Sequence, residues 1–232
     1  MVKSLTLAFD VYGTLIDTHG VIVALEKLVG ETAAEFSRMW REKQLEYSFR
    51  RGLMKNYETF AVCTSNALDF TCDYFKAPLS QKQKNELLEM YRVLPAFEDV
   101  KQGLVRSQEA GFRLFAFSNG SADAIEMLLI NARIRDFFLD VVSVDEIKSF
   151  KPDPDVYNHF MKRAGSDSAD SWMISSNPFD VIGSVSAGMR AAWVKRSPDA
   201  IFDPWGIEPT VTVNSLSELA GEINKYLNEN PG

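Results

Sequence analysis

Short, mostly apolar runs recur along this chain and predict β-strands. The first comprises residues 5–9, Leu-Thr-Leu-Ala-Phe, and a run of this length that ends at turn-forming residues is typical of a buried strand. Strands that alternate with helices need crossover connections, which predict a parallel, Rossmann-like α/β sheet with helices on both faces. By the same patterns, we expect further strands at residues 113–117, 140–143, 172–175, 191–194 and 211–213, and helices at 100–110, 122–131, 155–164, 181–188 and 216–227.

The segment between the first strand and residue 95 has no convincing strand pattern. Its apolar positions recur at helical spacing from about residue 21 to residue 90, with Phe36, Trp40 and Tyr47 on one side of a helix. An all-helical segment therefore interrupts the sheet domain after its first strand. We expect residues 1–16 and 96–232 to form the α/β core domain, and residues 17–95 to form an inserted all-helical cap subdomain.

Composition and charge narrow the range of partners. The chain has 232 residues, 46% of them hydrophobic, so it can bury a substantial core, and its formal net charge of -7 argues against nucleic acid or an anionic membrane as the main partner. No apolar stretch is long enough to span a bilayer, and no cluster of Cys and His indicates a metal site. Residues 1–4 lack a signal-peptide layout, and a disulfide between Cys63 and Cys72 would be poorly placed in one helical segment. We therefore expect a cytoplasmic protein with reduced thiols.

Polar residues follow four of the predicted strands. In an open parallel sheet, ligands bind at the carboxyl ends of the strands, so these residues should meet at one edge. Each one alone has an ordinary structural explanation as a turn residue or a helix cap, and for Ser176 we favour that explanation. Together, a carboxylate, a lysine and several hydrogen-bond donors at one edge indicate a chemical site. The residues are Asp10 and Thr14 after the first strand, Ser118 and Asn119 after the second, Lys151 after the third, and Ser175, Ser176, Asn177 and Asp180 after the fourth.

These residues fall into four motifs that resemble those of the haloacid dehalogenase superfamily, in the same order. The motifs are Asp10-Val11-Tyr12-Gly13-Thr14, Ser118-Asn119-Gly120, Lys151-Pro152-Asp153, and Ser175-Ser176-Asn177 followed by Asp180. The match covers nearly the whole chain, and the four motifs together are far more specific than the first one alone. The resemblance implies an α/β hydrolase in which the aspartate of the first motif is a covalent nucleophile.

Two features indicate a branch of this superfamily. Its phosphatases typically carry a second Asp two residues after the nucleophile, where this chain has Tyr12, and they hold Mg²⁺ with acidic residues of the last motif, where it has Ser175-Ser176-Asn177. Residues 40–47, Trp-Arg-Glu-Lys-Gln-Leu-Glu-Tyr, are similar instead to an insert motif of the L-2-haloacid dehalogenases. The resemblance implies hydrolysis of short-chain L-2-haloacids to D-2-hydroxyacids and halide, with no metal or cofactor. A phosphatase of the same superfamily is the alternative, and a non-catalytic binding protein is a third reading, which the retained charged residues of the motifs disfavour.

A 2-haloacid presents a carboxylate, a saturated carbon and a leaving halide, and each of these needs a partner. Asp10 can supply the carboxylate that displaces the halide. Ser118 Oγ and neighbouring backbone N–H groups are expected to bind the substrate carboxylate. Arg41, on the helical insert, is expected to face the departing halide. Asp180, helped by Asn177, is expected to act on the water that hydrolyses the resulting ester.

The remaining residues are expected to support the nucleophile. Lys151 would keep Asp10 ionised and in position, Ser175 would orient Lys151 by a hydrogen bond, and Thr14 would donate to the Asp10 carboxylate. By resemblance to the family, Tyr157 also lies near this cluster, although an ordinary helix position explains this residue equally well.

The substrate pocket is expected to be partly apolar. Three positions depart from the common family pattern, namely Glu42 in place of Gln, and Phe49 and Phe179 in place of Trp. They bear on substrate preference rather than on the reaction class, because Glu42 would weaken halide binding if it faced inward. A homodimer packed through the helical insert is implied by the family alone. The residues expected to bind substrate are Val11, Tyr12, Arg41, Leu45, Phe60, Ser118, Asn119 and Phe179.

Overall fold

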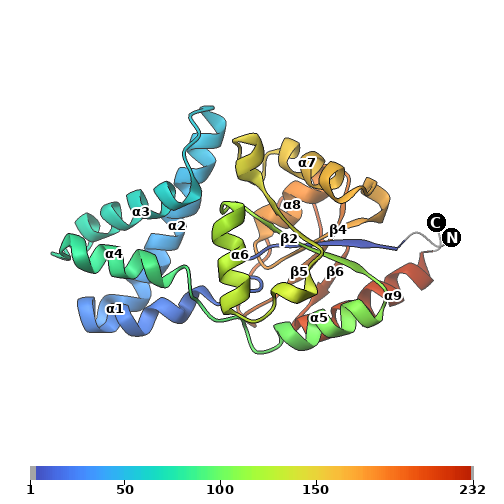
Figure 1. Ribbon diagram of the computed structural model, residues 1–232, viewed down its shortest axis with the longest axis horizontal. Helices are drawn as coiled ribbons and strands as arrows, with labels where there is room; N and C mark the ends of the chain where they lie inside the picture. Colours follow the sequence, from blue (N-terminus) through green and yellow to red (C-terminus); the bar gives the residue numbers. More distant parts are fainter. Residues whose placement is uncertain (1–3, 231–232) are drawn as a thin grey trace.

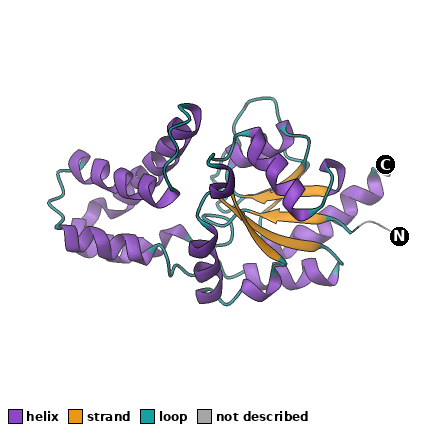
Figure 2. Cartoon of the chain, turned by 45° about the horizontal axis from the view of Figure 1, so that its top comes forward, coloured by secondary structure: helices purple, strands orange, loops and turns teal. Residues whose placement is uncertain are grey.

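A computed structural model describes residues 4–230 and contains a six-stranded sheet in which all paired strands run parallel (Figures 1 and 2). The strands are β1 (Thr6–Phe9), β2 (Arg113–Ser118), β3 (Asp140–Ser143), β4 (Ser171–Ser175), β5 (Arg190–Val194) and β6 (Val211–Val213). Their order, β3-β2-β1-β4-β5-β6, puts β1 between β2 and β4 in the interior of the sheet. Residues 1–3, for which no signal peptide is expected, and residues 231–232 of the predicted core domain lie outside the described residues.

Helices cover both faces of this sheet. They are α5 (Val100–Glu109), α6 (Ala122–Asn131), α7 (Pro154–Ala164), α8 (Pro178–Ser186) and α9 (Leu219–Glu229). Because side chains alternate along a strand, Leu7 and Phe9 of β1 point to one face and Ala8 to the other. Leu7 and Phe9 pack in one buried cluster with residues of α5, α6 and α9, whereas Ala8 packs in a second cluster with residues of α7 and α8. The predicted α/β architecture is confirmed.

Most element boundaries in the sheet domain differ from the predicted ones by a single residue or not at all, but α8 and α9 differ by more. Helix α8 begins three residues early, at Pro178, because the fixed φ of proline suits the first turn of a helix and needs no N–H partner there. Asp180 consequently lies within the first turn of α8. The predicted last helix divides into a 3-10 turn at Leu216–Glu218 and α9.

Four helices follow β1 and lie beside the sheet region, on the left of Figure 1. They are α1 (Ile22–Val29), α2 (Ala33–Leu53), α3 (Phe60–Tyr74) and α4 (Gln81–Met90). The chain enters and leaves them at adjacent points, since Asp17 N–H donates to the Pro95 carbonyl at 2.9 Å and Phe97 N–H to the Leu15 carbonyl at 3.0 Å. The predicted cap boundaries at residues 16/17 and 95/96 fall within these two paired segments.

Both cysteines lie on α3, where they are free and buried, as expected from their spacing. Burial raises the pKa of each thiol, which disfavours the reactive thiolate. Within residues 4–230, no helix is long and apolar enough to cross a membrane.

Candidate active site

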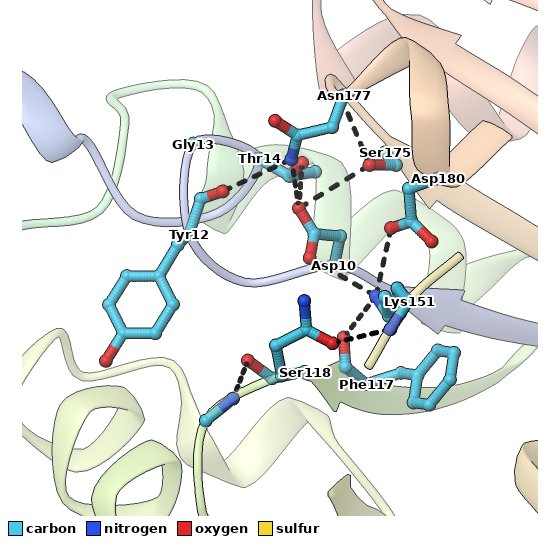
Figure 3. Close-up of polar contacts among 12 residues, drawn as sticks. Asp10, Tyr12, Gly13, Thr14, Phe117, Ser118, Lys151, Ser175, Asn177 and Asp180 are labelled. Atoms are coloured by element: carbon cyan, nitrogen blue, oxygen red, sulfur yellow. Dashed lines mark hydrogen bonds and ion pairs between the residues drawn. The ribbon is translucent and has the colours of Figure 1, made fainter. Parts of the chain in front are cut away.

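Asp10 follows β1 at the carboxyl edge of the sheet, and its carboxylate is the centre of a polar network (Figure 3). Its side chain is buried, and the two oxygens have different surroundings. Oδ2 accepts hydrogen bonds from Thr14 Oγ1 at 2.9 Å, Asn177 Nδ2 at 2.8 Å and Ser175 Oγ at 3.5 Å. Oδ1 accepts from Lys151 Nζ at 3.3 Å. Three loops thus converge on one carboxylate and leave Oδ1 the less occupied oxygen.

Lys151 connects this carboxylate to a second one. Its ammonium group is buried and contacts Asp10 Oδ1, Asp180 Oδ2 at 2.9 Å and the Phe117 carbonyl at 2.9 Å. A lysine ammonium has three protons, so these three acceptors occupy all of them. The prediction that Ser175 orients Lys151 is therefore wrong. Ser175 Oγ instead donates to Asp10 and accepts from the Asn177 N–H at 3.1 Å.

Asp180 is fully buried and is held from two sides. Lys151 contacts its Oδ2, and the buried Tyr157 hydroxyl donates to its Oδ1 at 2.8 Å. The tyrosine reaches this position because Gly183 has no side chain, and a Cβ there would lie 2.6 Å from the Tyr157 hydroxyl oxygen. Burial is the main reason that the pKa of Asp180 rises from 3.8 to about 6; Asp10 adds to the rise, and Lys151 and Tyr157 oppose it. Asp180 is thus a carboxylate able to take a proton near neutral pH.

Ser176 links the nucleophile loop to the loop after β4, although the sequence favoured a purely structural explanation for it. Its backbone N–H donates to Thr14 Oγ1 at 2.8 Å, and its hydroxyl donates to the Gly13 carbonyl at 2.8 Å. With one lone pair of Thr14 occupied in this way, the threonine proton can point to Asp10. No sequence signal reveals this role, because the first contact runs through a backbone group that every residue except proline carries.

Ser118 and Asn119 follow β2 and are almost completely buried. Ser118 Oγ accepts the Gly120 N–H at 3.1 Å, which leaves its hydroxyl proton available to a further acceptor. Asn119 Oδ1 accepts the backbone N–H of Lys151 at 2.9 Å and so fixes the start of the third motif. Figure 3 shows Ser118 on the same side of Asp10 as the Tyr12 side chain.

Arg41 lies on α2 and brings a positive charge to the site from the helical insert. Its Nη1 donates to Gln44 Oε1 at 2.6 Å, and its Nη2 lies 3.4 Å from the Tyr12 carbonyl, which Asn177 Nδ2 also approaches to 3.4 Å. Burial lowers the pKa of this guanidinium, while Tyr91 and Asp10 favour its charged form. A guanidinium remains charged under these conditions. The insert therefore supplies a half-buried cation near the nucleophile loop.

Aromatic side chains from both regions meet around these polar groups. The Tyr12 ring lies 6.0 Å from the Phe60 ring of α3, and burial raises its pKa to about 12, so its hydroxyl stays protonated. Phe49 of α2 and Phe179 of α8 meet edge to face with ring centroids 5.0 Å apart, and Leu45 lies half-buried on α2. The two phenylalanines that replace tryptophans of the family pattern thus contact each other across the two regions.

The side chains of Val11, which is expected to bind substrate, and of Glu42, which would weaken halide binding only if it faced inward, both point away from the site. The Val11 side chain is completely buried in the hydrophobic core, so a ligand could reach only the backbone of this residue. Glu42 faces away from the site: its side chain is 53% exposed and pairs with Arg38 at 3.0 Å. The inward charge that would weaken halide binding is therefore absent at this position.

Among residues 4–230, no group of three or more His, Cys, Asp or Glu side chains is arranged to hold a metal ion.

Comparisons with known proteins identify dehalogenases that are similar to this chain. The chain is 35% identical over 214 residues to an (S)-2-haloacid dehalogenase of Pseudomonas putida, covering 92% of this chain and 94% of that protein. It is 36% identical to haloacetate dehalogenase H-2 of Moraxella sp. (strain B), covering 94% and 97%. It superposes with a TM-score of 0.89 and 28% identity on the L-2-haloacid dehalogenase of Xanthobacter autotrophicus with chloropropionic acid covalently bound, covering 99% of this chain and 100% of that one.

A family model described as haloacid dehalogenase-like hydrolase matches residues 7–194, which include every strand-end residue of the site described above. The chain belongs to the haloacid dehalogenase-like hydrolases, and within them to the L-2-haloacid dehalogenase branch.

Proposed function

We propose that this protein hydrolyses short-chain L-2-haloacids to D-2-hydroxyacids and halide through an ester on Asp10. One observation supports this more than any other. A buried carboxylate, held by donors from three loops, lies near a half-buried guanidinium that comes from the other region of the molecule. Nucleophile and leaving-group cation are thereby supplied by separate parts of the chain. The names of the relatives and the covalent chloropropionic acid in the Xanthobacter structure support the same reaction.

In the first step, the carboxylate attacks the halogen-bearing carbon. Asp10 Oδ1 is the favoured attacking atom, because Oδ2 is surrounded by three donors. A C–O bond forms as the C–X bond breaks, and the halide leaves with the bonding electron pair towards Arg41. Ser118 Oγ and neighbouring N–H groups hold the substrate carboxylate meanwhile. Because the attack comes from the side opposite the halide, C2 is inverted.

In the second step, water attacks the carbonyl carbon of the Asp10 ester. Asp180 takes a proton from this water. The bond between the Asp10 carbonyl carbon and the ester oxygen, which was Asp10 Oδ1, breaks, and Asp180 returns the proton to the leaving alkoxide. Negative charge develops on Oδ2, where Thr14, Asn177 and Ser175 already donate. The products are the hydroxyacid and Asp10, which loses the second proton of the water to solvent and is again a carboxylate. C2 is not touched again.

We also propose that residues 17–95 act as a cap that closes over the sheet edge. The Tyr57 hydroxyl donates to Asp145 at 2.7 Å and its ring stacks on Phe150, so the segment after α2 contacts the core near Lys151. A homodimer and a cytoplasmic location are part of the proposal. The exposed Leu53 and Met54 at the end of α2 support an apolar contact through the cap, and sedimentation equilibrium tests it.

The proposed reaction is tested by halide release from L- and D-2-haloacids in metal-free buffer, with chiral analysis of the product. L substrates should react and give D-hydroxyacids. A single turnover in ¹⁸O-water, with enzyme in excess, should put the label into the Asp10 side chain rather than the product. Label in the first product would contradict the ester intermediate. Phosphate release that depends on added Mg²⁺, without halide release, would favour the phosphatase alternative.

A further inference from the structure

Gln44 is a buried polar residue of the cap. Its side-chain amide links two other side chains by two hydrogen bonds, called here the Gln44 relay, whose donors and acceptors cannot be exchanged. It lies one helical turn after Arg41 on α2, and only 1% of its surface is exposed. Its Oε1 accepts from Arg41 Nη1 at 2.6 Å, and its Nε2 donates to Thr64 Oγ1 of α3 at 2.5 Å. Both ends of one amide are therefore engaged inside the cap.

The direction of this relay is fixed by its far end. Thr64 Oγ1 donates its single proton to the Phe60 carbonyl at 2.8 Å, so towards Gln44 it can only accept. The amide must turn its NH₂ to Thr64 and its carbonyl oxygen to Arg41. A flipped amide would place NH₂ protons against the guanidinium and lose both hydrogen bonds. The α3 backbone thus determines which way the Arg41 guanidinium is held.

The chemical type of the partner matters as much as its position. A neutral amide oxygen can hold a guanidinium without cancelling its charge, whereas a carboxylate would form an ion pair with it. Among the ion pairs of residues 4–230, none involves Arg41, and its hydrogen-bond acceptors are the Gln44 amide and the Tyr12 carbonyl. No carboxylate of the described residues therefore contacts the Arg41 guanidinium, so an anion can bind to it directly.

We propose that Gln44 is a positioning residue that aims Arg41 at the departing halide and leaves its charge unpaired. The inference rests on the proposed function, because it gives Gln44 a role in the halide-displacing step alone. Ester hydrolysis occurs around Asp180, which belongs to the other region and makes its contacts with Lys151 and Tyr157.

The test compares four variants of the full chain with the wild type. Gln44→Glu keeps the shape and adds a charge, Gln44→Met removes both hydrogen bonds, and Thr64→Val removes only the far end of the relay. Gln102→Glu makes the same chemical change on the exposed surface of α5 and serves as the matched control. Rapid-quench experiments with an L-2-chloro acid measure halide release and ester decay separately, and bromide inhibition reports halide binding.

We expect Gln44→Glu to slow halide release on the order of 10²-fold, as for loss of a charged transition-state contact, and to weaken bromide inhibition. Gln44→Met should slow halide release about tenfold, and Thr64→Val should slow it by less. Each variant loses a contact that orients Arg41, but neither adds a charge that would pair with it. Ester decay should be unchanged in all of them, and Gln102→Glu should match the wild type in both steps.

Three outcomes would overturn the proposal. They are unchanged halide release in Gln44→Glu, equal slowing of halide release and ester decay, and wild-type bromide inhibition in a slowed variant. Should Gln44→Met fail to fold, Gln44→Glu and Thr64→Val decide the matter, with circular dichroism confirming their folding. Failure of the proposed function has a different signature, because the wild-type protein itself would then release no halide.

Discussion

On the sheet side of the site, Lys151 lies between the carboxylates of Asp10 and Asp180, whereas on the cap side Arg41 contacts neutral oxygens of Gln44 and Tyr12. The sheet side pairs its charges tightly, and its cation has no capacity left for a ligand. The cap side keeps its charge open to one. A network in which every proton of the cation is already bound can hold a nucleophile and a base in position. Only a cation without a carboxylate partner can bind an anion that forms during the reaction.

The balance of charge also differs between the two sides. Two buried carboxylates and one buried lysine give the sheet side a net charge of about −1 if both carboxylates are ionised, and Arg41 would compensate it. The site is close to neutral only with the cap in place. In the proposed reaction, the sheet region thus carries the covalent chemistry, and the cap region supplies the partner for the leaving group.

Replacement of Asp10 should have the largest effect. Asp10→Asn should abolish halide release, because it removes the nucleophile while keeping nearly the same shape. Ion chromatography of released halide checks this, with Asp69→Asn on the exposed surface of α3 as the control. Substantial halide release by correctly folded Asp10→Asn would move the chemistry to another group.

Replacement of Asp180 should separate the two steps. Asp180→Asn should release halide but hydrolyse the ester on the order of 10²- to 10⁴-fold more slowly, the usual contribution of a general base. Mass spectrometry of the protein should then show the substrate acid attached at Asp10. If steady turnover continued without accumulated ester, Asp180 would not be the base.

The wild-type protein should show the pH dependence of the same group. The base must be ionised to accept a proton, so ester hydrolysis should rise with pH through the pKa of Asp180 and level off above it. Burial keeps this pKa above its ordinary value in the ester, where Asp10 no longer carries a charge that adds to the rise. Below that pKa the ester should accumulate after a burst of halide. Stopped-flow and quench measurements across this range check the direction, which would be opposite for a group acting as an acid.

Replacement of Arg41 tests the cap side. Arg41→Ala should slow halide release on the order of 10²-fold, and Arg41→Lys should restore little of it, because an ammonium does not match the contacts of the guanidinium fork. Ester decay should keep its wild-type rate in both variants. Equal slowing of both steps would show that the two sides are not separate.

The sequence predicted the sheet side better than the cap side. The rule that strand ends meet at one edge was enough to bring Asp10, Ser118, Lys151 and Asp180 together, because the parallel topology follows from the alternation of elements. This rule could not identify the hydrogen-bond partner of Ser175. Ser175 contacts Asp10 and not Lys151 because the three protons of Lys151 are already bound.

On the cap side, helical periodicity gives the face on which a residue lies but not its contacts with another helix. Gln44 lies within the motif at residues 40–47, yet its hydrogen bonds depend on the packing of α2 against Thr64 of α3. The burial of the Val11 side chain in the core could not be predicted from the sequence either, because the tight loop after β1 has no regular periodicity.

The smallest expected effect is on the sheet side, where Tyr157→Phe removes one hydroxyl and keeps the ring. That hydroxyl donates to Asp180 Oδ1 at 2.8 Å and so favours the ionised carboxylate. Without it the pKa of Asp180 should rise further, and the rising limb of ester hydrolysis should move to higher pH by about one unit. The plateau rate at high pH should fall little, because Lys151 still holds the other oxygen. The pH profile of ester decay checks this shift, with Tyr226→Phe on α9 as the matched control. A uniform loss of rate with the limb in its wild-type position would mean that Tyr157 supports packing alone.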